Sequence, residues 1–211
     1  MGGMIVNSIL YSVGCAFFQT LVPFVTAYAC AKYKNPVATF LYSLAIVVMS
    51  IPVVGNEAAS LRLAFDLHLY DHIWGLWVMK ANYLGVYFLV FYAAFAAQPK
   101  DYKEAAMIDG AGNWQVMTRI GFPLAKGEFF TVLLINFITY WNDYQTPFIY
   151  MPDKPTVAYN TWNLMSSTEY DMSKPPVILT SAVLFLLPVL ILFLVFQKRL
   201  MKNLNVGGIK G

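Results

Sequence analysis

Three long stretches of this chain carry no Asp, Glu, Lys or Arg: Met1 to Ala31, Val37 to Asn56 and Pro175 to Gln197. Each is long enough to cross a hydrocarbon layer of about 30 Å as a helix. Ile73 to Ala97 and Glu128 to Tyr150 are nearly as apolar and hold one or two charges each. A soluble helix would show one polar face, whereas these stretches are apolar on all sides. We therefore predict an all-α membrane protein with about five transmembrane helices, in a single domain over residues 1–211.

The basic residues are shared unevenly between the two alternating sets of connecting segments. Of the 14 Lys and Arg residues, one set holds only Arg62, Lys154 and Lys174. Because basic residues accumulate on the cytoplasmic side, this set is expected outside, in the loops Glu57 to His72 and Met151 to Lys174. The other set, with the C-terminus, is expected in the cytoplasm: Lys32, Lys34, Lys100, Lys103, Arg119, Lys126, Lys198, Arg199, Lys202 and Lys210.

The predicted cytoplasmic segment 98–127 interrupts the apolar pattern with a polar, glycine-containing sequence. Asp101 to Glu104 has capping-box spacing and predicts a helix start. Asp109 to Asn113 contains two glycines and predicts a turn. Asn113 is expected to cap a second short helix, in which Trp114 and Met117 would share a face. The product is a helix–turn–helix coupling loop between two membrane spans.

This loop resembles the EAA loop of bacterial ABC-importer permeases, whose pattern is E-A-A-x3-G-x9-I-x-L-P. Only Phe122 departs from it, in place of Leu. The resemblance implies that the loop docks on a cytoplasmic ATPase subunit, with Ala105 and Ala106 leaving one helix face thin enough to enter a groove. The implied ATPase-coupling residues are Glu104, Ala105, Ala106, Gly110, Ile120 and Pro123.

Three further segments resemble the maltose-type, carbohydrate branch of these permeases. Ala27 to Lys34 is similar to its first cytoplasmic corner, and Trp141-Asn142-Asp143 to its W-N-D signature. The ending from Phe196 to Gly211 is similar to its Gly-rich terminus. Members usually have six spans, and the span that precedes the position of Asn7 and Ser8 is missing from this sequence.

The resemblance implies a multi-pass permease subunit of a bacterial cell membrane that imports a sugar or oligosaccharide. The implied partners are ATPase subunits, a second permease subunit, an extracellular solute-binding protein and membrane lipid. The chain contains no G-x-x-x-x-G-K-[ST] pattern, so ATP hydrolysis is expected in a separate subunit and no cofactor in this one.

Lys80 and Asp143 are charges inside predicted spans, where a charge usually faces a cavity or a partner. We expect them to lie near each other or to line the outer half of the translocation pathway. The alternative is that each side chain extends to the membrane–water interface, so that its charged group is hydrated. Gln19, Asn82 and Asn142 are candidates to bind a hydroxyl-rich solute, although bonding between helices is the commoner role of such residues.

Two alternatives remain open from sequence. The EAA loop is shared by importers of other solutes, so another small solute is possible. His68 and His72 are four positions apart around Asp71, a spacing that invites a metal site or a membrane-embedded enzyme, but no third ligand is evident. The remaining option is a truncated, non-transporting membrane protein.

Overall fold

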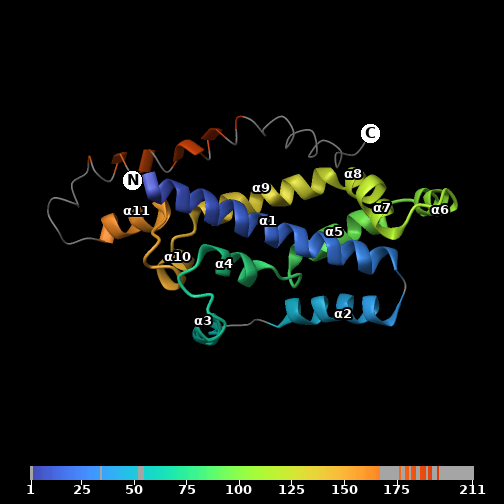
Figure 1. Cartoon of the computed structure of the whole chain (residues 1–211), viewed down its shortest axis with the longest axis horizontal. Helices are drawn as coiled ribbons and strands as arrows, with labels where there is room; N and C mark the ends of the chain where they lie inside the picture. Colours follow the sequence, from blue (N-terminus) through green and yellow to red (C-terminus); the bar gives the residue numbers. More distant parts are fainter. Residues whose placement is uncertain are drawn as a thin grey trace. The chain divides into compact units, whose positions relative to one another are not determined.

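The computed structural model describes residues 2–33, 35–51 and 55–166, together with isolated positions between 176 and 194 (Figure 1). Every regular element within these residues is a helix. The Gly-rich ending therefore lies outside the described residues, and the last predicted span is described only at these separate positions, which are helical. The chain forms two compact units. Unit 1 contains residues 1–15, 57–78 and 137–211, and unit 2 contains residues 16–56 and 79–136.

The described helices in chain order are α1 (Gly2–Lys32), α2 (Pro36–Ser50), α3 (Glu57–Asp66), α4 (Ile73–Lys80), α5 (Val86–Ala96), α6 (Asp101–Ile108), α7 (Asn113–Val116), the π-helix η1 (Met117–Gly121), α8 (Phe122–Leu124), α9 (Lys126–Asn142), α10 (Gln145–Tyr150) and α11 (Val157–Ser166).

The all-helical class expected from the sequence is present in the described residues, but the spans are less regular than expected. Among the described residues, only α1 combines the length and apolar character needed to cross a membrane. A second would result if Asn113–Leu124 and Lys126–Asn142, which are bent by 75°, form one span. α2 and α5 are apolar but shorter. The count of five spans stays a prediction.

Two predicted spans contain a break. Ile73 to Ala97 is divided into α4 and α5 by residues 81–85, where Gly85 has a φ of 154° that other residues rarely adopt. Glu128 to Tyr150 is divided at Asp143 and Tyr144. A hydropathy pattern does not register these breaks, because apolar residues continue on both sides of each.

Unit 2 is held together by a cluster of aromatic rings around Phe24 of α1. Four rings from α5, α8 and α9 pack on it edge to face, with centroids 4.8–5.6 Å away: Phe91, Phe95, Phe122 and Phe129. Such geometry adds to the packing energy of the buried area. The rings fix the C-terminal half of α1 against the helices on either side of the loop 98–127.

A buried polar contact joins α1 to α9 inside the same unit. Asn136 Nδ2 donates to Thr20 Oγ1 at 3.0 Å, and Thr20 Oγ1 donates to the Ala16 carbonyl at 2.7 Å. Both side chains are buried. Hydrogen bonds of this kind join helices where water is absent.

In unit 1, polar side chains of the first part of α1 bind the segment before α11. Asn7 Nδ2 donates to the Pro155 carbonyl at 3.3 Å, and the Val157 N–H donates to Ser8 Oγ at 2.8 Å. The Trp77 indole N–H donates to the Leu10 carbonyl at 3.1 Å. These contacts seat the N-terminal part of α1 against segments distant in sequence.

The Gly75→Ala variant should unfold more easily than the wild type, by about 1–3 kcal/mol, as overpacked sites do. A β-carbon at Gly75 would lie 2.2 Å from the Leu69 carbonyl oxygen, a backbone atom that cannot rotate away. The measurement is thermal unfolding of the detergent-solubilised chain. Gly3→Ala is the control, since a β-carbon there meets no atom within 4 Å. Equal melting temperatures for the two variants would contradict the packing described.

Candidate functional site: the coupling hairpin

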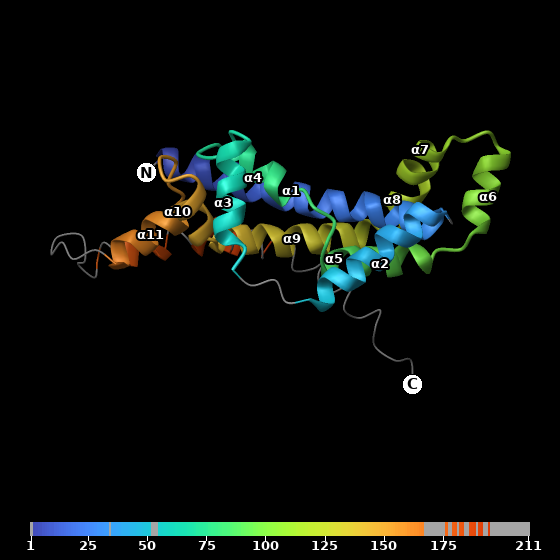
Figure 2. The ribbon, with the colours of Figure 1, turned by 90° about the horizontal axis from the view of Figure 1, so that it is seen from below.

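The segment from α6 to α8 forms the hairpin that the sequence predicts, and we call residues 101–124 the coupling hairpin. α6 and α7 pack on each other, and Figures 1 and 2 both show α6 beyond the C-terminal end of α1. Gly110 has a φ of 81°, in the left-handed region that favours glycine. Its N–H donates to the Met107 carbonyl at 3.1 Å, and the Ala111 N–H donates to Ala106 at 2.9 Å. This pair is a Schellman motif, which ends α6 and reverses the chain.

α6 begins at Asp101 and α7 at Asn113, where the sequence predicts helix starts, but the predicted caps are wrong. Lys100, with helical φ and ψ, precedes α6, so Asp101 lies inside the helix and makes no capping box with Glu104. The backbone of Lys100 is helical and lacks the extended conformation that a capping residue usually has. α7 is preceded by Gly112, whose N–H donates to Gln115 Oε1 at 3.0 Å, and Asn113 is its first residue.

The two apolar residues assigned to one face of the second helix lie in different environments. Trp114 is 69% exposed and Met117 is 8% exposed. Trp114 faces solvent and Met117 faces the packed interior, so the prediction of a shared face is wrong.

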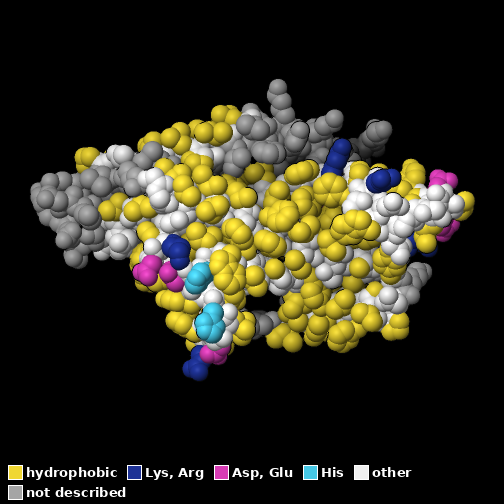
Figure 3. Space-filling model, in the orientation of Figure 1, with side chains coloured by type: hydrophobic (Ala, Val, Ile, Leu, Met, Phe, Trp, Pro, Cys, Tyr) yellow, Lys and Arg dark blue, Asp and Glu magenta, His cyan; other side chains and the backbone are white. Residues whose placement is uncertain are grey.

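The residues of the predicted motif lie along the whole hairpin. Glu104 and Ala105 are exposed on α6, Ala106 and Ile120 are half-buried, and Pro123 is exposed on α8. No residue of α6 is buried. On the face drawn in Figure 3, charged side chains gather near α6 and near α3, while hydrophobic side chains cover most of the rest.

Exposed apolar side chains accompany the motif, and the sequence analysis did not predict them as contacts for a partner. They are Tyr102, Met107, Ile108 and Trp114, of which Ile108 is 86% exposed. Large apolar side chains inside a polar segment are the signal that would have found them, because they stabilise nothing within the hairpin. Together with Ala105 they give the hairpin an apolar surface suited to a protein partner.

Hydrogen bonds join the base of the hairpin to the end of α1. Lys103 Nζ donates to the Lys32 carbonyl at 3.1 Å, and Lys32 Nζ donates to the Gln98 carbonyl at 3.1 Å. Gln98 Nε2 donates to the Gly121 carbonyl at 3.3 Å. The Lys103 ammonium also lies 4.3 Å from the centre of the Tyr33 ring. Burial raises the pKa of the Tyr33 phenol, so this ring stays uncharged.

Asp143 and Asn142 lie at the break between α9 and α10. Asp143 accepts from the Tyr11 hydroxyl at 2.8 Å and from the Thr146 N–H at 3.0 Å. Asn142 Nδ2 donates to the Ile138 carbonyl of its own helix at 2.7 Å. Trp141 is buried. In the described chain these three residues end one helix and begin the next, which gives Asp143 a local structural role.

The other pathway candidates belong to unit 2. Gln19 and Lys80 are half-buried, and Asn82 is exposed in the break after α4. Because Asp143 is in unit 1, its pairing with Lys80 stays a prediction. Substituting Lys80→Met and Asp143→Asn together remains its test, with solute uptake and assembly as the two measurements.

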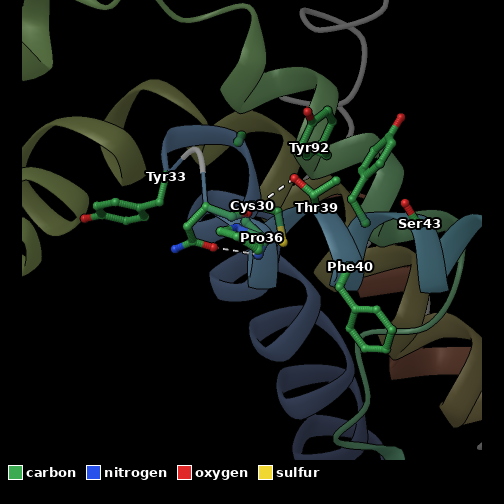
Figure 4. Close-up of a pocket in the computed structure, with 11 residues that line it drawn as sticks. Cys30, Tyr33, Pro36, Thr39, Phe40, Ser43 and Tyr92 are labelled. Atoms are coloured by element: carbon green, nitrogen blue, oxygen red, sulfur yellow. Dashed lines mark hydrogen bonds between the residues drawn. The ribbon is translucent and has the colours of Figure 1, made fainter.

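A pocket of about 840 Å³ lies within unit 2, between the end of α1, α2 and Tyr92 of α5 (Figure 4). Cys30, Thr39, Phe40 and Ser43 are among its lining residues, and Tyr33 points away from Tyr92 in this view. Asn35 Oδ1 caps α2 by accepting from the Ala38 N–H at 2.7 Å. None of the motif residues of the hairpin lines this pocket.

His68 and His72 are both exposed near the end of α3. His72 Nδ1 lies 2.7 Å from the Tyr70 carbonyl oxygen. Within the described part of the chain, no three His, Cys, Asp or Glu side chains gather in a way that could hold a metal ion.

The chain is similar to permease proteins of known transport systems. The arabinooligosaccharides transport system permease protein of Bacillus subtilis is 28% identical over 92% of this chain and 67% of its own length. The melibiose/raffinose/stachyose import permease protein of the same organism is 26% identical over 100% of this chain and 77% of its own length. In a crystal structure of a bacterial ABC transporter involved in import of the acidic polysaccharide alginate, one chain shares the fold, with a TM-score of 0.77 and 21% identity. That match covers 93% of this chain and 74% of the other.

A family model matches residues 19–206, which contain the whole coupling hairpin. The chain therefore belongs to the family of inner membrane components of binding-protein-dependent transport systems.

Proposed function

We propose that the chain is a permease subunit of an ATP-driven carbohydrate importer, and that the coupling hairpin is its contact with the ATPase subunits. The observation that carries this proposal is the exposed α6, which holds the Glu104-Ala105-Ala106 sequence and has no buried residue. Family membership makes the chain a membrane component of a transport system rather than an enzyme. The names of the two permease relatives support a sugar or oligosaccharide as the solute.

The proposed mechanism is alternating access driven from the cytoplasm. ATP closes the pair of ATPase subunits, which displaces the hairpin, and the packed helices respond as rigid bodies. A second permease subunit completes the pathway, and a solute-binding protein delivers the sugar on the opposite side. Gln19, Lys80, Asn82, Asn142 and Asp143 remain the proposed pathway residues, because polar groups within an apolar chain are costly unless they serve a cavity or a contact.

Affinity purification of the tagged chain from its own membranes tests the hairpin assignment. The ATPase and a second permease should accompany the wild type, and Glu104→Lys should lower the recovered ATPase by about tenfold, the equivalent of roughly 1.4 kcal/mol. Asp101→Lys is the matched control, since it makes the same charge change on the same exposed helix outside the motif. Equal loss in both variants would indicate a general charge effect and count against the motif.

The solute is tested separately, through the binding protein. Mass spectrometry of the small molecules bound to the co-purified binding protein should find a sugar or oligosaccharide. A solute of another class would leave the hairpin assignment intact and replace the carbohydrate with that solute.

A further inference from the structure

We propose that Lys103 is the positioning residue through which movement of α6 reaches the C-terminal end of α1. This inference rests on the proposed function, because it takes the hairpin as the ATPase contact. For the hairpin to drive transport, displacement of the exposed helix α6 has to reach the packed helices of the chain.

α6 lies at the surface of unit 2. All its side chains are exposed or half-buried, so few contacts connect it with the rest of unit 2. Glu104 is exposed while the adjacent Lys103 is half-buried. Neighbouring positions on a helix point about 100° apart. One residue therefore serves a partner while the next contacts the chain itself.

Lys103 binds the C-terminal end of α1. Lys32 is the last residue of α1, and its carbonyl is one of those a helix leaves without an internal partner at its end. The Lys103 ammonium donates to this carbonyl and lies over the Tyr33 ring that follows. A cation at a helix C-terminus is also favoured by the helix dipole. Lys103 thus caps α1 from a helix about 70 residues further along the chain.

The hydrogen bond from Lys103 to Lys32 is one of three that connect the end of α1, α6 and the residues near the two ends of the hairpin. Lys32 returns a hydrogen bond to Gln98 before the hairpin, and Gln98 binds Gly121 near its end. The end of α1 is thereby joined to α6 and to the residues Gln98 and Gly121, which lie near the two ends of the hairpin. A shift of α6 strains this set unless α1 follows.

The C-terminal end of α1, which Lys103 contacts, is firmly packed. Tyr28 is buried, and its ring centroid lies 5.2 Å from that of Phe95. A β-carbon at Gly121 would lie 2.8 Å from the Tyr28 ring, so η1 rests directly on α1. A force applied at Lys32 therefore enters a helix held by aromatic contacts rather than a loose end.

The test is hydrogen–deuterium exchange of the assembled importer in lipid nanodiscs, with and without the ATP analogue AMP-PNP. The reporter is the segment 29–40, which includes the Tyr33 amide bound to the Ala29 carbonyl at 3.0 Å. In the wild type, AMP-PNP should change the exchange rate of this segment by about fivefold, a coupling free energy near 1 kcal/mol. In Lys103→Met this dependence on nucleotide should disappear while the bound ATPase is unchanged.

Two variants separate transmission from simple loss of stability. Lys103→Arg should keep the nucleotide dependence, because a guanidinium can donate to the same carbonyl and stack on the same ring. Lys100→Met removes a neighbouring cation that donates no hydrogen bond to α1 among the described residues, and it should behave as the wild type. A purely structural role for Lys103 would alter exchange equally in both nucleotide states.

The inference is overturned if Lys103→Met keeps the nucleotide dependence, if it releases the ATPase, or if the assembled wild type shows no dependence. A wild-type chain that carries no ATPase would instead refute the proposed function, and this inference with it.

Discussion

Replacing Phe24 with alanine is expected to lower the free energy of unfolding by about 3–5 kcal/mol, the usual cost of removing a buried aromatic ring. Phe24 is 2% exposed and is the centre of the ring cluster in unit 2. The variant would leave four neighbouring rings without their common partner. Dispersion contacts supply much of the packing energy in a membrane, so this loss does not depend on water.

Thermal unfolding in detergent gives the measurement, and a fall of about 10 °C is expected at roughly 2–4 °C per kcal/mol. Phe40→Ala is the control, because it removes the same ring from a side chain that is 65% exposed on α2. A melting temperature for Phe24→Ala within a degree or so of that control would refute the central position given to this ring.

The second large effect is expected from Gly110→Pro, which should reduce the ATPase recovered with the chain by about tenfold or more. Proline holds φ near −65°, whereas the turn requires 81° at this position. It also removes the N–H that donates to Met107. The hairpin would then present α6 in another direction, while the packed helices keep their contacts because α6 buries no residue.

Gly112→Ala is the matched control for this variant. Gly112 has a φ of −70°, and a β-carbon there meets no atom within 4 Å. We expect Gly112→Ala to bind ATPase as the wild type does, and Gly110→Ala to give an intermediate loss from backbone strain. If Gly110→Pro recovers as much ATPase as Gly112→Ala, the shape of this turn is not needed for docking.

The sequence was sufficient for the helical class and for the position of the hairpin, because both depend on local pattern. Charge-free runs predict helices, and the glycine at 110 occupies the one turn position in this hairpin that has a positive φ. The caps at Lys100 and Gly112 were missed because a cap depends on the backbone angles of one residue, and several neighbours had suitable side chains.

Contacts between distant segments were beyond sequence reasoning. Nothing in the local pattern around Lys103 indicates that its partner is the carbonyl of Lys32, since a carbonyl is present at every position. Asn136 could be recognised as a polar residue in an apolar run, but its bond to Thr20 requires the packing of α1 on α9. The break at Asp143 is likewise stabilised by Tyr11, which is 132 positions away.

The π-helix at Met117–Gly121 has a consequence for how related sequences are aligned. A π-helical turn holds about one residue more than an α-helical turn. Deleting one residue here would therefore leave a regular α-helix rather than a broken one. Because the wide turn accommodates the additional residue locally, the helical segments before and after it would keep approximately the directions that they have here. A one-residue gap at this place in a homologue would thus be compatible with a hairpin that projects in the same direction, and need not be an error of alignment.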